Sequence, residues 1–224
     1  MNSEQWDRRY AGSELLWTAQ PNRFLVAEVL GLRPGRALDL ACGEGRNTVW
    51  LAEQGWRVTG VDFSGVALAK ARSLAEARRV DPEWLQANLV EHEPERGAYD
   101  LAIVLYLQVP AAERRTILRR AAAALAPGGV LLVVAHDSSN LEHGWGGPQD
   151  PAVLYTAAHV IADLDGEGLE IERAETVGRP VETPDGEKTA LDLLVRARVV
   201  SRGSVNPSGR TTRPMVKWDR CEWN

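Results

Sequence analysis

Apolar residues in this chain gather in short runs that alternate with segments of helical spacing. Strand-like runs lie at 37–41, 57–61, 83–87, 99–105 and 130–136. Between them, apolar residues recur three or four positions apart, which predicts helices over 47–54, 65–79 and from Pro110 to the Pro127-Gly128-Gly129 stop. Strands that alternate with helices in this way predict a parallel sheet with right-handed crossovers and helices on both faces.

The two ends of the chain depart from this alternation. Short helices are predicted over 5–10, 14–17 and from Pro21 to Gly31. After residue 136 come a glycine-rich loop, a predicted helix at 151–164, and two strands at 169–177 and 189–200 joined around Pro184-Asp185-Gly186. We therefore expect a Rossmann-like, doubly wound α/β fold with a mostly parallel seven-stranded sheet and an antiparallel final strand.

The domain organisation predicted from this pattern has three parts. Residues 1–20 are expected to form an N-terminal lid segment, and residues 21–200 the main domain. Periodicity vanishes in residues 201–224, where Gly, Pro, Ser, Thr and Arg dominate, so we expect a disordered tail there.

Composition argues against several classes of partner. The net charge of −5 gives the whole molecule no attraction to nucleic acid or anionic lipid. No apolar run approaches the roughly 20 residues that span a bilayer, and two cysteines make no disulfide framework. We expect a cytoplasmic monomer or homodimer without membrane or nucleic-acid partners. The basic helix face at 114, 115, 119 and 120 is expected to be solvated.

One stretch carries the candidate chemistry: a strand containing Asp39, a turn containing Gly43 and Gly45, and a second strand that ends in Asp62. Glycines let the backbone approach a ligand, and a carboxylate after the second strand can accept both hydroxyls of a ribose. The plain alternative is a tight strand-to-helix turn and a surface aspartate. A dinucleotide site favours a third glycine where this chain has Thr48.

The pattern Asp39-x-x-x-Gly43-x-Gly45 resembles the first motif of class I S-adenosylmethionine-dependent methyltransferases. The segments Ala87-Asn88-Leu89 and Ala126-Pro127-Gly128-Gly129 resemble later motifs of that family, and the resemblance covers roughly residues 22–200. The segment Trp6-Asp7-x-Arg9-Tyr10 is most similar to the small-molecule branch, such as the tellurite-resistance and thiopurine methyltransferase-like proteins. The resemblance makes residues 21–200 a class I methyltransferase domain.

The resemblance implies S-adenosyl-L-methionine as cofactor. It places Asp39 and the glycine turn against the methionine part, Asp62 at the ribose, Phe63 beside the adenine and Asn88 at the adenine amino group, where the family has Asp. The cofactor-binding residues expected from it are Asp39, Ala41, Cys42, Gly43, Glu44, Gly45, Asn47, Asp62, Phe63, Asn88, Leu89 and Leu105.

Candidates for the acceptor side follow strands four and five. Tyr106 could line the acceptor pocket or only touch the cofactor, and His136 could act as a base or be a strand-end histidine without a chemical role. No metal site is expected, because Asp100 lies at the wrong end of its strand. Aromatic side chains suited to a sulfonium, or only to anchoring the N-terminal segment, are Trp6, Tyr10, Trp17 and, in the glycine-rich loop, Trp145.

The function predicted is methyl transfer to a small-molecule acceptor with a sulfur, oxygen, nitrogen or chalcogen nucleophile, by in-line displacement. The chain lacks the Asn/Asp-Pro-Pro-Tyr/Phe motif and the Pro-Cys pair of nucleic-acid methyltransferases. Two alternatives stay open: a nucleotide-dependent oxidoreductase, and a cofactor-binding regulator without turnover.

Overall fold

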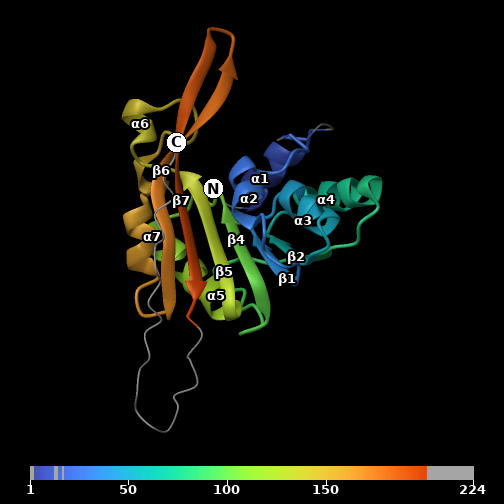
Figure 1. Ribbon diagram of the computed structural model, residues 1–224. Helices are drawn as coiled ribbons and strands as arrows, with labels where there is room; N and C mark the ends of the chain where they lie inside the picture. Colours follow the sequence, from blue (N-terminus) through green and yellow to red (C-terminus); the bar gives the residue numbers. More distant parts are fainter. Residues whose placement is uncertain (1–2, 13–14, 17, 201–224) are drawn as a thin grey trace, which may run out of the picture.

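A seven-stranded sheet with the order β3-β2-β1-β4-β5-β7-β6 forms the centre of the protein (Figure 1). The computed structural model describes residues 3–12, 15–16 and 18–200. Strand β7 runs antiparallel to β5 and β6, and the other neighbours are parallel, which confirms the predicted fold class. The strands are β1 (Arg36–Leu40), β2 (Arg57–Asp62), β3 (Glu83–Gln86), β4 (Tyr99–Leu105), β5 (Leu125–His136), β6 (Leu169–Thr183) and β7 (Gly186–Val199).

Helices cover both faces of the sheet and bury a core on each (Figure 1). Leu25 of α2 and Leu51 of α3 belong to the core on one face, whereas Leu118 of α5 and Val160 of α7 belong to the core on the other. The helices are α1 (Ser3–Tyr10), α2 (Arg23–Val29), α3 (Arg46–Glu53), α4 (Gly65–Arg78), α5 (Ala111–Ala124), α6 (Asn140–His143) and α7 (Ala157–Asp163), with a 3-10 turn η1 (Pro151–Val153).

The centre of the sheet is apolar on both faces, as parallel sheets require. Residues 130–135 of β5 are all buried, and β1 lies between β2 and β4, with Asp39 opposite Gly60 and Ile103. Strand β5 begins at Leu125, five residues before the predicted start, but its register with β4 shifts from Leu125 to Val130. The Pro127-Gly128-Gly129 segment, with Gly128 at φ 81°, therefore forms an irregularity inside the strand. The strand order reverses between β1 and β4, which makes their carboxyl ends the topological switch point.

The last two strands are longer than predicted. The predicted turn around Pro184-Asp185-Gly186 is confirmed, but residues 178–183 and 186–188 lengthen the two strands, which pair as far as Thr183 and Gly186. Strand β5 stops pairing with β7 at His136 and Asp192, so residues 179–190 pair only with each other. They form a hairpin that projects past the carboxyl edge of the sheet, in orange at the top of Figure 1. The sequence signal was weak here because an exposed two-stranded ribbon needs no apolar alternation.

The helix predicted at 151–164 is wrong as a single element. The chain forms η1, then an extended step in which Tyr155 bridges to Asp137, and only then α7. Thr156 begins α7 because its side chain accepts from the backbone N–H of His159, whose ring reaches back in a capping box. This cap fixes the position of the extended step beside the end of β5.

The basic face of α5 is not simply solvated, which corrects the sequence-based expectation. Nε of Arg114 lies 2.6 Å from Oδ2 of Asp163, and Nε of Arg115 lies 3.0 Å from Oδ1. Asp163 and Arg114 are only 1% and 6% exposed. A partner 49 residues away along the chain cannot be found from helical periodicity. The buried pair joins α5 to α7 beneath one face of the sheet.

Candidate functional site

The glycine turn after β1 owes its two glycines to different causes. Gly45 has φ 79°, and a Cβ there would meet Trp84 at 2.6 Å and Ala71 at 2.7 Å, so its glycine allows helix and strand to pack. Gly43 has φ 54°, and a Cβ there would meet only the Tyr10 hydroxyl, at 3.1 Å. Gly43 is therefore the position at which bare backbone faces the space above the turn.

Asp62 ends β2 directly beside this turn. Its Oδ2 accepts the backbone N–H of Gly43 at 2.8 Å, and its Oδ1 accepts that of Ser64 at 2.9 Å. Burial raises the pKa of Asp62, and the nearby Asp7 adds to the rise, whereas these backbone bonds oppose it. A carboxylate offers about four lone pairs, so two remain after the backbone bonds. Those two can accept a ligand diol.

Asp39 lies on β1 below the turn and is buried. Its Oδ2 accepts the hydroxyl of Thr48 at 2.6 Å. Burial raises the pKa of Asp39 to about 7, against the lowering effect of that hydroxyl bond. The charge of Asp39 therefore changes near neutral pH. When ionised, this carboxylate would stabilise a cationic ligand group placed beside it.

The remaining predicted cofactor residues form two groups: some have side chains that hydrogen-bond to other parts of the chain, and the others offer backbone or apolar surface. The Glu44 carboxylate accepts the backbone N–H of Leu16 and pairs with Lys70 at 3.0 Å, and Asn47 accepts the backbone N–H of Asn22. These two side chains therefore anchor the segment before β1. The others place backbone or apolar surface along the carboxyl edge: Ala41 with φ 64°, buried Cys42, Leu89 and Leu105, and half-buried Phe63.

Asn88 is exposed after β3, and its side chain is used locally. Its amide nitrogen lies 3.3 Å from the Glu91 carboxylate, and its oxygen accepts the backbone N–H of Val90 at 3.1 Å. One lone pair of that oxygen remains for a ligand amino group.

Helix α1 lies over the glycine turn. The rings of Trp6 and Tyr10 stack with centroids 5.4 Å apart, and Tyr10 is buried against Gly43. Asp7 accepts the Ser64 hydroxyl at the start of α4. Trp17, the third predicted aromatic of this segment, lies outside the described residues, as does residue 14, the first of the predicted helix at 14–17.

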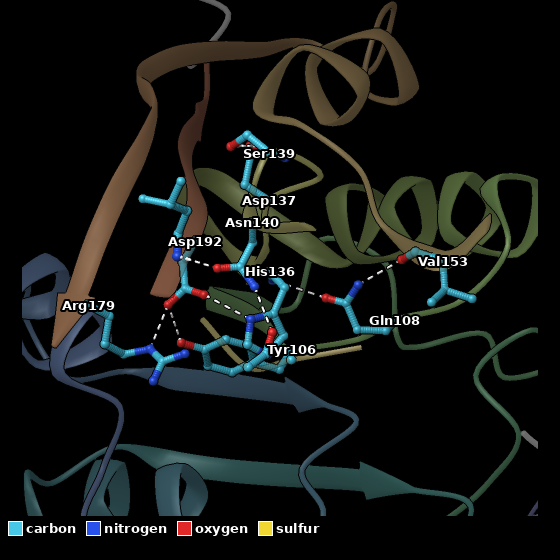
Figure 2. Close-up of polar contacts among 12 residues, drawn as sticks. Tyr106, Gln108, His136, Asp137, Ser139, Asn140, Val153, Arg179 and Asp192 are labelled. Carbon is cyan, nitrogen blue, oxygen red and sulfur yellow. Dashed lines mark hydrogen bonds and ion pairs between the residues drawn. The ribbon is translucent and has the colours of Figure 1, made fainter. Parts of the chain in front are cut away.

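The two predicted acceptor-side residues meet at Asp192, which sequence reasoning missed (Figure 2). The Tyr106 hydroxyl donates to Oδ2 of Asp192 at 2.7 Å, and Nε of Arg179 donates to the same atom at 2.7 Å. Nδ1 of His136 lies 3.2 Å from Oδ1, within ion-pair distance, although the angles make no hydrogen bond. The side chain of Asp192 is fully buried, so this carboxylate joins β4, β5 and the hairpin.

Electrostatics within this cluster follow from burial and from the shared carboxylate. Burial raises the pKa of Asp192, but the adjacent His136 ring and the hydrogen bonds from Arg179 and Tyr106 outweigh it and hold the pKa below its ordinary value. Burial also raises the pKa of Tyr106 well above 10, with Asp192 adding to the rise. At neutral pH the cluster therefore contains an ionised aspartate and a neutral tyrosine.

A second residue that sequence reasoning missed is Arg46, which directly follows the glycine turn. Its half-buried side chain lies close enough to Tyr106, Asp39 and Arg179 for each to influence its pKa, which burial lowers. The position beside Gly45 was a usable signal, because the first helical residue after such a turn borders the ligand space. Arg179 offered no such signal, since its contact with Asp192 depends on the hairpin.

The glycine-rich loop reaches the same edge of the sheet, but the Trp145 side chain is largely exposed there. That side chain is 46% exposed, with the Lys188 ammonium 5.8 Å from its ring centroid. Gly147 packs on the imidazole instead, since a Cβ there would lie 2.9 Å from Nδ1 of His136. The loop therefore covers His136 with backbone and not with an aromatic ring.

A hollow in the structure lies away from this site. This hollow of about 450 Å³ lies at the opposite edge, among Arg36, Trp56 and Glu83, far from the strand ends described above. Within residues 3–12, 15–16 and 18–200, no group of three or more His, Cys, Asp and Glu side chains is placed to hold a metal ion. Over that same part of the chain, none of the helices combines the length and apolarity needed to cross a bilayer.

Comparison with known proteins shows what the segment around this site is similar to. Residues 37–129 match the family model described as "Methyltransferase domain". The chain is 34% identical over 116 residues to ribosomal RNA small subunit methyltransferase C of Alcanivorax borkumensis, covering 46% of this chain and 33% of that protein. It is 34% identical over 125 residues to demethylmenaquinone methyltransferase of Thermus thermophilus, covering 55% of each.

Solved structures extend the likeness over the whole sheet. The structure reported under "Conversion of a Disulfide Bond into a Thioacetal Group during Echinomycin Biosynthesis" matches with a TM-score of 0.70 and 24% identity, over 90% of this chain and 94% of that one. The chain spans about a third to just over half the length of the curated relatives it matches first. The matched segment contains the glycine turn, Asp62 and the switch point, so residues 37–129 are similar to a methyltransferase domain, and the whole sheet has the fold of the solved structure.

Proposed function

We propose that the protein is an S-adenosylmethionine-dependent methyltransferase that acts on a small molecule. The observation that carries this proposal is the meeting of the Gly43 backbone with the Asp62 carboxylate at the β1/β4 switch point. The family match over residues 37–129 supports it. A small acceptor is favoured by the net charge of −5, which offers a nucleic acid no attraction.

The residues present suit this cofactor. The two lone pairs left on Asp62 would accept the ribose hydroxyls, and ionised Asp39 would face the methionine ammonium. Phe63 and Leu89 would flank the adenine, and Asn88 would accept from its amino group. When bound, S-adenosylmethionine supplies an electrophilic methyl group on a sulfonium.

On the acceptor side, His136 is the group that we assign to proton removal. Its Nδ1 faces Asp192, which orients the ring and leaves Nε2 as the proton-accepting atom of the neutral imidazole. Nε2 would take the proton of an O–H, N–H or S–H acceptor. The bound sulfonium would supply the methyl group, its carbon–sulfur bond breaking as the acceptor's lone pair bonds to carbon and its sulfur leaving as the neutral thioether of S-adenosylhomocysteine. Tyr106, held by Asp192, forms the wall beside that path.

We assign residues 1–20 the role of a lid. Tyr10 seated on Gly43 and Asp7 bonded to Ser64 close the space over the glycine turn from above. Exclusion of water by such a cover keeps the donor and acceptor aligned and protects the sulfonium. The aromatic pair Trp6 and Tyr10 presents ring faces suited to a cation.

Calorimetry with S-adenosylhomocysteine tests the proposal. One site per chain is expected, with methyl transfer detected in a panel of thiols, phenols, amines and chalcogen anions. A folded protein that binds no S-adenosylhomocysteine, but is protected from heat by a nicotinamide dinucleotide, would be an oxidoreductase instead. Binding without transfer to any member of the panel would favour the regulator.

The affinity for S-adenosylhomocysteine should depend on pH through Asp39. Its carboxyl group has a pKa of about 7 and must lose its proton to pair with the ligand ammonium. The dissociation constant is therefore expected to rise about tenfold from pH 8 to pH 6, as for a single ionisation. The Asp39→Asn variant should bind more weakly at pH 8 and show no such dependence. If the dissociation constant of Asp39→Asn depends on pH as steeply as that of wild type, the ionising group is not Asp39.

A further inference from the structure

We propose that Arg46 and Arg179 form a carboxylate-binding pair, and that the methyl acceptor is an organic molecule that carries a carboxylate. The inference rests on the proposed function and narrows its substrate class. It starts from two guanidinium groups that come from distant parts of the chain and lie at the carboxyl edge of the sheet. Arg179, at the root of the projecting hairpin, lies over the Tyr106 ring at 5.6 Å. Arg46 directly follows the glycine turn after β1, the strand beside β4, and Tyr106 directly follows β4.

Arg46 is a charge without a counter-ion. Within residues 3–12, 15–16 and 18–200, no carboxylate lies within ion-pair distance of it. The nearby Glu44 is bonded to Lys70 and to the backbone of Leu16, so it is not available. Partly burying a guanidinium without a partner costs free energy that a bound anion would restore. The side chain is thus placed as one half of a binding site.

Arg179 contacts both Asp192 and the Tyr106 ring. Its Nε donates to Asp192, and its guanidinium lies over the Tyr106 ring at 5.6 Å, which fixes the plane of the fork. Figure 2 shows Nε of Arg179 directed at Asp192, with the rest of the guanidinium beside Tyr106. A planar guanidinium fixed in this way can donate two parallel bonds to a carboxylate, which a lysine could not do.

The charge balance around Tyr106 points the same way. Arg46 and Arg179 are positive, Asp192 is negative, and Asp39 is only partly ionised near neutral pH. A bound sulfonium adds another positive charge. An acceptor with a carboxylate would bring the site close to neutrality, whereas a cationic acceptor would add repulsion in a partly buried space. The second possible source of a carboxylate is the methionine part of the cofactor, and the experiment separates the two.

The test measures binding to protein saturated with S-adenosylhomocysteine, using 2-mercaptobenzoate and thiophenol as a matched pair. Wild type is expected to bind the carboxylated thiol at least tenfold more tightly than thiophenol. Arg46→Gln and Arg179→Gln should each lose most of that preference, measured as the ratio of the two dissociation constants within each variant. Arg72→Gln, on the exposed face of α4, is the matched control and should behave as wild type.

A second arm titrates S-adenosylhomocysteine and 5′-methylthioadenosine, which lacks the amino-acid part, into each variant. If Arg46→Gln weakens only the first of these and does not alter thiol binding, the arginine serves the cofactor and the inference is overturned. Equal binding of the two thiols to wild type overturns it as well. If wild type binds no S-adenosylhomocysteine, the proposed function itself is wrong, and this outcome differs from the two that overturn only the carboxylate inference.

Discussion

The Asp192→Ala variant is expected to unfold with a free energy about 3–5 kcal/mol lower than wild type, because it leaves buried charge without its partner. Arg179 loses the acceptor for its Nε, and the Tyr106 hydroxyl loses the carboxylate oxygen to which it donates at 2.7 Å. His136 loses the carboxylate that orients its ring. Urea denaturation followed by tryptophan fluorescence measures the change, since the chain has eight tryptophans.

Two companion variants separate burial from charge. Asp192→Asn keeps one oxygen acceptor in the same volume and should cost less than the alanine variant. Asp185→Ala, at the exposed tip of the same hairpin, should stay within about 0.5 kcal/mol of wild type. If Asp192→Ala unfolds no more easily than Asp185→Ala, the cluster does not stabilise the fold.

The acid dependence of this stabilisation has a definite sign. The pKa of Asp192 is lower in the folded protein than its ordinary value of 3.8, so its contribution is complete above that value. It is lost as the pH falls through the folded-state pKa, because protonation removes the charge that Arg179 pairs with. The difference between wild type and Asp192→Ala should therefore shrink below about pH 4. A difference that grows in acid would contradict the ionised state of Asp192.

The local parts of the site could be predicted from sequence. Asp39, Gly43 and Asp62 lie within one strand–turn–helix–strand unit, whose spacing along the chain sets their spacing in space. The alternation of strands and helices likewise fixed the sheet, since few topologies join buried parallel strands by short crossovers. The role of Gly45 nevertheless differs from the predicted approach of backbone to a ligand. Its glycine allows close packing against Trp84 and Ala71, which only the folded arrangement reveals.

The parts that depend on long-range contacts could not be predicted. Asp192 meets Tyr106 across 86 residues, and Arg114 meets Asp163 across 49. In both cases a charged residue that a periodicity argument assigns to the surface is buried by a partner that the sequence does not identify. The acceptor side of the site is built almost entirely of such contacts. The cofactor side could therefore be outlined from sequence, while Arg179 and Asp192 could not.

The largest effect on ligand binding is expected for Asp62→Ala, which should weaken the binding of S-adenosylhomocysteine by at least about 100-fold. Hydrogen bonds to a charged group contribute about 1.5–3 kcal/mol each, and two ribose hydroxyls would lose such bonds. The carboxylate also accepts from Gly43 and Ser64, so part of the loss could come from a displaced turn. Asp81→Ala, exposed before β3 at the opposite edge, controls for a general change in charge.

A cycle with the 2′-deoxy analogue of S-adenosylhomocysteine separates the two causes. Wild type should bind the analogue at least tenfold more weakly than S-adenosylhomocysteine itself, whereas Asp62→Ala should bind both alike, because the hydroxyl has lost its acceptor in either case. The coupling free energy is then about 1.5–3 kcal/mol. A displaced turn alone would weaken both ligands by the same factor in the variant and leave the wild-type preference intact. Preserved discrimination would therefore show that Asp62 shapes the Gly43 turn without touching the ribose.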